Sequence, residues 1–310
     1  MSALSIIATN STSGMDDPVI ECFLVLRFFC ILNVYLCSLT LVVRKSKILN
    51  MCMRITTTQF AVQDSALANA EIIEDIIQQS DTDWILTPEG ALSGYFQPPV
   101  INRITEQNWL DTLEVEPHLQ NVIATKDVGV LLGTGWMEPD GAPYNQVRIY
   151  QGSRGYQGAY AKRLLTTTHQ GGGERNAYIP GWSPCVFNLS DTFRGGVLIC
   201  NDIWATPMAS PQGNPYYINE LAQAGVNVLF CSVNCNVKNW CPIIYDWHQS
   251  HLQMYAKFYN MYVVVSGNTL SMDTKPVTQS QCPIGVIGPD GEWIHKFETQ
   301  QQETYTVEIK

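Results

Sequence analysis

The chain has 310 residues, of which 45% are hydrophobic and 15% are charged, so it carries enough apolar material for a large core. This composition excludes a disordered chain. The formal net charge of −10 argues against a nucleic-acid-binding surface, because phosphate contacts require clustered Lys and Arg side chains. We therefore expect a soluble, acidic, globular protein without a nucleic-acid partner.

An apolar segment near the N-terminus, residues 22–43, is interrupted only by Arg27 and Asn33, and basic residues follow it at 44–47. Its length is sufficient to cross a bilayer, which requires about 20 residues. It is unlike a signal peptide, because acidic residues precede it and no small-residue cleavage site follows it.

Two interpretations of this N-terminal region follow. In the first, residues 22–43 contact or span a membrane, and their basic flank holds the rest of the chain in the cytoplasm. In the second, residues 1–52 are a dispensable hydrophobic extension, because Met51 and Met53 lie directly before the first globular strand. An arginine at mid-membrane depth costs about 2.5–3.5 kcal/mol, which favours the second interpretation. Both place a globular domain, residues 53–310, in the cytoplasm.

Residues 53–310 alternate strand and helix signals separated by short turns. In the first half, Asp64 is the expected N-cap of a helix, and the expected strands are 54–62, 84–87, 128–136, 146–150 and 155–161, with helices at 65–79 and 107–125. In the second half the expected strands are 185–189, 195–200, 226–233, 262–267, 284–287 and 292–297, with helices at 216–224 and 247–260. Many strands with few helices predict an α/β domain in which sheets pack on each other with helices outside.

Three residues with useful chemistry lie at or just after predicted strand ends. Glu89 follows WILT, Lys162 follows YQGAY, and Cys200 closes the apolar strand GGVLIC. Each alone has an ordinary structural explanation. Together they supply a base, a cation that stabilises an oxyanion, and a thiol that becomes a nucleophile when a carboxylate accepts its proton.

The motifs around these residues resemble those of the nitrilase, or carbon–nitrogen hydrolase, superfamily, in the same order and across essentially all of residues 53–310. They read PEGALSGY, GTGWMEPDGAPYN, YAKRLL, ERNAYIPG, GVLICND and LAQAGVNVLF. The resemblance implies a four-layer α-β-β-α sandwich that hydrolyses non-peptide C–N bonds through a cysteine thioester, without a metal or cofactor.

The resemblance also implies roles for particular residues. Glu89 would be the general base, Lys162 the oxyanion-stabilising cation and Cys200 the nucleophile. Glu174 matches the second glutamate of the superfamily, which positions substrate and water, and the backbone N–H of Asn201 would complete the oxyanion hole.

Departures from the superfamily pattern affect the expected substrate. Ala161 precedes the lysine where arginine is common, and the run that begins Ile203-Trp204 replaces an Arg–aromatic–Pro–Glu run. Cys-Asn-Asp stands where nitrilases more often carry Cys-Trp-Glu. We therefore expect hydrolysis of a small linear amide or carbamoyl compound, with nitriles less favoured. Two alternatives are an N-acyltransferase that uses the same site and a catalytically inactive scaffold.

Further residues are expected around this site. The candidate substrate-binding residues lie just beyond motif-bearing strands, and they are Tyr95, Trp204, Asn234 and Cys235. His169 lies in a glycine-containing loop that would cover the site. Asp202 is expected to turn away from the thiol and accept backbone hydrogen bonds, because a carboxylate beside the nucleophile would raise the pKa of the thiol.

The remaining expectations concern metals and subunits. Cys231, Cys235 and Cys241 fit no common metal-ligand spacing with His248 or His251, so we predict no metal site. The aromatic stretch 247–260 is expected to contribute to the core and to a subunit contact, in a homodimer or larger homo-oligomer.

Overall fold

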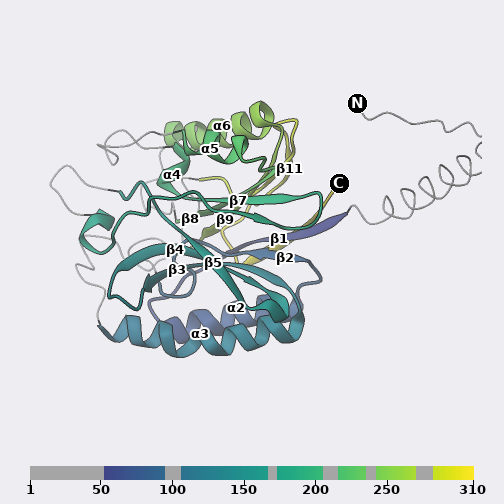
Figure 1. Cartoon of the computed structure of the whole chain (residues 1–310). Coiled ribbons are helices and arrows are strands. Elements are labelled where there is room, and N and C mark those ends of the chain that lie inside the picture. Colours follow the sequence, from purple (N-terminus) through teal and green to yellow (C-terminus); the bar gives the residue numbers. More distant parts are fainter. Residues whose placement is uncertain (1–51, 95–105, 167–172, 205–215, 235–241, 270–281) are drawn as a thin grey trace, which may run out of the picture. The chain divides into compact units, whose positions relative to one another are not determined.

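The computed structural model describes residues 52–310 except 95–105, 167–172, 205–215, 235–241 and 270–281. The described residues belong to the unit Cys52–Lys310, shown in colour in Figure 1. Residues 22–43 lie outside them, so the two interpretations of that segment remain predictions. Within the described part of the chain, none of the helices combines the length and the apolar character needed to cross a membrane.

The first half of the domain carries five strands and two long helices. In chain order these are β1 (Met53–Phe60), α2 (Ala66–Gln79), β2 (Trp84–Leu86), α3 (Glu106–Lys126), β3 (Gly129–Met137), β4 (Pro143–Gln151) and β5 (Tyr156–Ala161). Two short 3-10 turns, η2 (Gly152–Arg154) and η3 (Gly173–Asn176), flank β5.

The second half continues with strands and helices of similar kind. In chain order these are β6 (Val186–Asn188), β7 (Arg194–Ile199), α4 (Asn201–Trp204), α5 (Tyr217–Gln223), β8 (Val228–Val233), α6 (Pro242–Tyr259), β9 (Tyr262–Asn268), β10 (Gly285–Ile287), β11 (Trp293–Lys296) and β12 (Glu303–Ile309).

The strands form one hydrogen-bonded sheet in the order β5-β4-β3-β2-β1-β9-β8-β7-β6, with β10, β11 and β12 off this path. The pairs from β3 through β1 and β9 to β7 are parallel, and both edges of the path are antiparallel. Only two residue pairs join β1 to β9, Gln59 with Gly267 and Phe60 with Asn268. This short junction lets the sheet fold over, so that its two halves face each other.

Helices cover the outer faces of both halves. Figure 1 shows α2 and α3 below the β1–β5 half and α4, α5 and α6 above the β7–β9 half. Because the two halves of the sheet lie between these helices, the domain has four layers. The predicted α-β-β-α sandwich is confirmed, with the difference that its two sheets are continuous through β1 and β9.

The outer layer of the first half shows how the sequence produces this packing. Along α2, Ile73, Ile76 and Ile77 recur on one face and pack against buried residues of α3 and of the sheet. The predicted N-cap Asp64 is wrong by one residue, because the side chain of Ser65 accepts the hydrogen bond from the N–H of Ala68.

Several predicted element boundaries were also wrong. The final strand β12 was not predicted, although its residues alternate between exposed and more buried positions and pair antiparallel with β1 along residues 53–59. The strand β4 begins at Pro143, three residues before the predicted start, and α6 begins at Pro242, five residues early. The extra residues of β4 pair with β3 in a hairpin, so tertiary pairing extends the strand. The helix α6 begins at a proline, a residue that is favoured in the first turn of a helix.

Candidate active site

A tight backbone crossing places Glu89 in the interior. After β2, the N–H of Thr87 donates to Leu131 O, and the N–H of Leu92 donates to Gly133 O at 3.0 Å. A Cβ atom on Gly133 would lie 1.9 Å from Pro88 O, so only glycine allows this approach. The loop is therefore fastened against β3, and the Glu89 side chain is fully buried.

Lys162 follows β5 and is also fully buried. Its backbone N–H donates to Asn145 O at 2.8 Å, which continues the pairing of β5 with β4 past the end of the strand. Its carbonyl oxygen accepts from the N–H of Gly181 at 2.8 Å. These two bonds fix the direction of a side chain whose burial would be unfavourable without paired charges.

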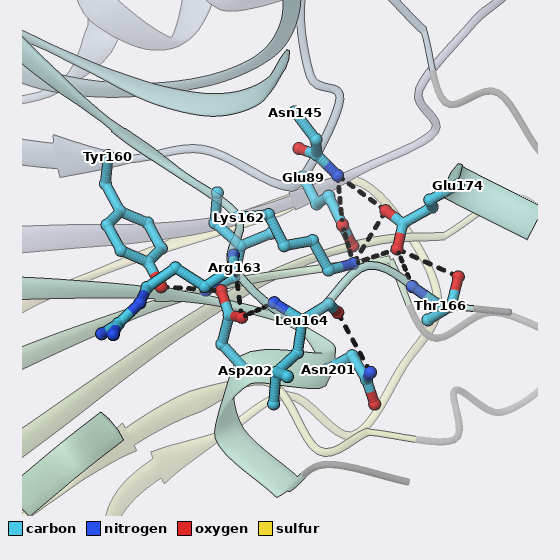
Figure 2. A network of polar contacts seen from close by, with 11 residues as sticks. Glu89, Asn145, Tyr160, Lys162, Arg163, Leu164, Thr166, Glu174, Asn201 and Asp202 are labelled. Carbon is cyan, nitrogen blue, oxygen red and sulfur yellow. Dashed lines mark hydrogen bonds and ion pairs between the residues drawn. The ribbon is translucent and has the colours of Figure 1, made fainter. Parts of the chain in front are cut away.

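The ammonium of Lys162 lies between two buried carboxylates (Figure 2). Its Nζ is 2.7 Å from Glu89 Oε1 and 2.8 Å from Glu174 Oε1. The side-chain nitrogen of Asn145 donates to the same two oxygens, at 2.8 Å each. The second oxygen of Glu174 accepts from the backbone N–H of Thr166 at 2.7 Å and from its hydroxyl at 3.0 Å. The second oxygen of Glu89 is buried and has no hydrogen-bond partner among the described residues.

These contacts make the two glutamates electrostatically different. Burial raises the pKa of Glu89 to about 7, although Lys162 and Asn145 both act to lower it. Burial also acts to raise the pKa of Glu174, but the Lys162 charge and the hydrogen bonds from Lys162, Thr166 and Asn145 outweigh it and hold that pKa below its usual value. Glu174 is therefore a fixed counter-ion, whereas Glu89 exchanges a proton near neutral pH.

Cys200 ends the apolar strand β7 at a sharp turn into α4. Its φ of +45° lies in the left-handed region, which non-glycine residues rarely adopt. Its N–H donates to Ser232 O at 3.0 Å, and its carbonyl accepts from the N–H of Ile203. Five of the six residues of β7 are buried, as the continuous apolar run predicted. Backbone strain at a buried cysteine that forms no disulfide is typical of a functional position.

Two polar side chains fasten this turn to the segment after Lys162 (Figure 2). Asn201 Nδ2 donates to Leu164 O at 3.0 Å. Asp202 Oδ1 accepts from the backbone N–H groups of Arg163 and Leu164, at 3.1 and 2.6 Å. The residues that follow the cysteine are thus bonded directly to the residues that follow the lysine, although the two segments belong to different halves of the sheet.

Asp202 behaves as the sequence predicted, because its carboxylate accepts backbone hydrogen bonds. Its Oδ2 also accepts from the hydroxyl of Tyr160 at 2.9 Å and from the N–H of Ile199 at 3.3 Å. Burial nevertheless raises the pKa of Asp202 to about 6, since hydrogen bonding and the Lys162 charge only partly offset the loss of solvent.

The predicted substrate-binding residues are only partly described. Trp204 is buried and stacks on His248 with ring centroids 3.9 Å apart. Asn234 is buried, and its side-chain oxygen accepts from Asn268 at 2.9 Å. Tyr95 and Cys235, like His169, lie outside the described residues. Contact of any of these five residues with substrate therefore remains a prediction.

Two residues of the site, Asn145 and Thr166, were given no role by the sequence analysis. Asn145 joins the two carboxylates, although it appeared only as the last letter of the motif GTGWMEPDGAPYN. Thr166, four residues after Lys162, donates to Glu174 from its backbone N–H. Among the described residues, no group of three or more His, Cys, Asp or Glu side chains is arranged to hold a metal ion.

The four-layer fold and the residues brought together here agree with what the superfamily resemblance implies. Residues 50–310 match the family model for carbon–nitrogen hydrolases, and the chain belongs to this family. The resemblance to the carbon–nitrogen hydrolase superfamily that the sequence motifs indicated is thereby confirmed. The comparison with curated proteins gives no match.

Solved structures with a similar fold include several of an amidase from Nesterenkonia sp. AN1. One of them is 15% identical, covers 83% of this chain and 93% of its own, and has a TM-score of 0.65. A variant with covalent addition of the acetamide moiety of fluoroacetamide at its active-site cysteine, and another in complex with butyramide, each reach a TM-score of 0.67 at 15% identity. Each covers 83% of this chain and 90% of its own. At this identity the likeness shows the fold.

Proposed function

We propose that the protein hydrolyses a small linear amide or carbamoyl compound through a thioester on Cys200. The observation that carries this proposal is the buried Glu89–Lys162 pair, in which one carboxylate oxygen is bonded to the lysine while the other has no partner among the described residues. The solved amidases support the same chemistry, because a small amide lies in one and an acetamide adduct on the active-site cysteine of another.

In the first half of the reaction, the Cys200 thiol gives its proton to Glu89 Oε2, and the thiolate attacks the carbonyl carbon of the substrate. The resulting oxyanion is stabilised by the Lys162 ammonium and by the backbone N–H of Asn201. Glu89 then returns the proton to the substrate nitrogen, the C–N bond breaks, and ammonia or an amine leaves a thioester on the sulfur.

In the second half, Glu89 accepts a proton from water, and the hydroxide attacks the thioester carbon. The C–S bond breaks, the carboxylic acid product leaves, and the proton on Glu89 returns to the sulfur. Both halves require a carboxyl group that takes and gives a proton at neutral pH, which agrees with the Glu89 pKa of about 7. Glu174 stays ionised throughout and keeps Lys162 in place.

We place the substrate between this site and a wall that includes Trp204 and Asn234, with Tyr95 and Cys235 completing it. The stacked pair of Trp204 and His248 supplies a flat, buried surface four residues after the nucleophile. Such a surface suits a short acyl group.

The experiment is ammonia release by the full chain from a panel of simple amides, carbamoyl amino acids and nitriles. The proposal expects turnover of an amide or carbamoyl compound, and loss of it in Cys200→Ala. The matched control is Cys231→Ala, which removes another buried thiol on the neighbouring strand β8 and should keep the activity. No turnover on any compound, together with a Cys200 thiol inert to iodoacetamide, would instead support a non-catalytic scaffold. Transfer of the acyl group to an added amine in preference to water would support an N-acyltransferase.

We further propose that residues 53–310 carry this activity in the cytoplasm without residues 1–52. Removing residues 1–50 should leave ammonia release unchanged and the protein in the soluble fraction. Loss of membrane association on truncation, with activity retained, would support the alternative in which residues 22–43 are an anchor.

A further inference from the structure

Asn145 lies at the centre of the site but takes no part in the reaction described above. It lies on β4, and its backbone carbonyl accepts the N–H of Lys162 at 2.8 Å. Its side-chain nitrogen lies 2.8 Å from Glu89 Oε1 and 2.8 Å from Glu174 Oε1, and both bonds are buried. Figure 2 shows the amide nitrogen turned toward the two carboxylates and the amide oxygen turned away.

The chemistry of the site determines the orientation of this amide. A carboxylate accepts hydrogen bonds and donates none when ionised. The opposite rotamer would direct the amide oxygen at two carboxylate oxygens, which repel it. Asn145 therefore uses both hydrogens of its NH2 group, one for each glutamate, while its Oδ1 has no partner among the described residues. Leaving that oxygen buried and unbonded is unfavourable, so the two bonds on the nitrogen must outweigh the loss.

This arrangement makes the two oxygens of Glu89 unequal. Oε1 accepts from Lys162 and from Asn145, so both of its lone pairs are engaged. Protonation of Oε1 would break one of these bonds. Protonation of Oε2 breaks no hydrogen bond, because this oxygen accepts none from the described residues. When Glu89 is protonated, Oε2 is therefore the favoured position of the proton.

We propose that Asn145 is a positioning residue, which holds Oε1 of Glu89 so that Oε2 is the oxygen that takes and gives the proton. The assignment of the base role to Glu89 rests on the proposed function. The placement of the proton rests on the hydrogen bonds alone.

Three charged or titratable groups interact electrostatically with Glu89. They are Lys162 after β5, Glu174 on η3 and Tyr178 after η3. Burial and the nearby carboxylates raise the pKa of Tyr178 far above its usual value, so it stays neutral during turnover. Asn145 is thus the neutral donor in a charged set, and it acts to lower the pKa of Glu89. Replacing Asn145 leaves the surrounding charges in place but removes a hydrogen bond that lowers the pKa of Glu89.

The test compares the wild type with Asn145→Leu, which keeps the branched shape of the side chain, although it is larger, and has no donors. Loss of a hydrogen bond to a charged group should move the acidic limb of the kcat/KM profile upward by about one pH unit. The matched control is Gln146→Leu, which alters the next residue on β4, whose side chain bonds Glu138 and Arg148. The control should keep the wild-type limb. Asn145→Ser, which retains one donor, replaces Asn145→Leu if circular dichroism shows that the leucine variant is unfolded, and it should shift the limb in the same direction.

A second measurement separates this inference from the proposed function. Difference infrared spectroscopy follows the protonated carboxyl band against pH, and Glu89→Gln identifies the band that belongs to Glu89. We expect this band to titrate at higher pH in Asn145→Leu than in the wild type, whether or not any amide is turned over. Glu89 titrating at the wild-type pH in the Asn145 variants, or activity reduced by the same factor at every pH, would overturn the inference. Absence of turnover with a shifted Glu89 band would reject the proposed function alone.

Discussion

The two halves of the folded sheet contribute to the site in different ways. The β1–β5 half contributes Glu89, Asn145 and Lys162, which are buried polar residues bonded to one another. The β7–β9 half contributes Cys200, which directly follows the buried apolar strand β7 and lies in a strained turn. The residues of the β1–β5 half are thus held by side-chain hydrogen bonds, whereas Cys200 is held by backbone geometry. Asp202, which bonds the backbone on both sides, connects the two.

The substitution with the largest expected effect is Lys162→Met, which removes the cation from the buried polar residues of the β1–β5 half. Two carboxylates would then share a buried site without a cation, so the free energy of unfolding should fall by about 3–5 kcal/mol. Loss of an oxyanion stabiliser should also lower kcat at least about 10³-fold. Denaturant unfolding and ammonia release measure the two effects. Unchanged stability would mean that the ion pair is not formed in solution.

The link between the halves is tested by Asp202→Asn. The substitution keeps the shape but turns an NH2 group toward N–H or O–H donors, so about 2–3 kcal/mol of stability should be lost. Displacement of the cysteine turn from Lys162 should lower kcat by up to roughly 100-fold.

Glu116→Gln is the matched control for Asp202→Asn. It alters a buried carboxylate on α3 that accepts from Tyr150 on the outer face of the sheet. This control should lose stability without losing kcat. Equal kcat losses in the two variants would show that Asp202 acts only through general stability.

The pH dependence sharpens the comparison between the two glutamates. Burial raises the pKa of Glu89 to about 7, and the base must be ionised, so kcat/KM should fall about tenfold per pH unit below pH 7. The pKa of Glu174 is lowered, so its ionisation should not change kcat/KM in this pH range. A profile that stays flat from pH 7 down to pH 5 would contradict the assignment of Glu89 as base.

The smallest effect is expected at a contact between the two halves that lies outside the catalytic set. Ser232 on β8 donates its hydroxyl to Thr87 O at 3.0 Å. Ser232→Ala should lower the free energy of unfolding by about 1 kcal/mol. We expect kcat within about twofold of the wild type, since Glu89 remains fixed by the crossing at Gly133. A large loss of kcat would instead mean that this single hydrogen bond holds the loop that carries Glu89 in position.

Local patterns in the sequence predicted the strand ends near which the three candidate catalytic residues lie, while the catalytic roles themselves stay predictions. Glu89, Lys162 and Cys200 each follow a short apolar or β-branched run, and strand ends are where an α/β domain presents reactive groups. The four layers came from the superfamily resemblance rather than from periodicity. The buried strand β7 could be read directly, because its residues are uniformly apolar.

Contacts between distant segments could not be read from the sequence. Nothing near Asn145 indicates that Glu89 and Glu174, 56 and 29 residues away, share its amide. The continuity of the two sheets depends on two residue pairs at the ends of β1 and β9, which no local pattern encodes. The strand β12 is different, because the alternation of its more buried and exposed residues is a local pattern that the sequence itself contains.

The most direct test of the account is mass spectrometry of the full chain quenched in acid during turnover of a small amide. The account predicts an acyl group, with the mass of the substrate acyl portion, on the peptide that contains Cys200, and no such adduct in Cys200→Ala. Continued ammonia release by Cys200→Ala, or an acyl group found on a different side chain, would contradict it.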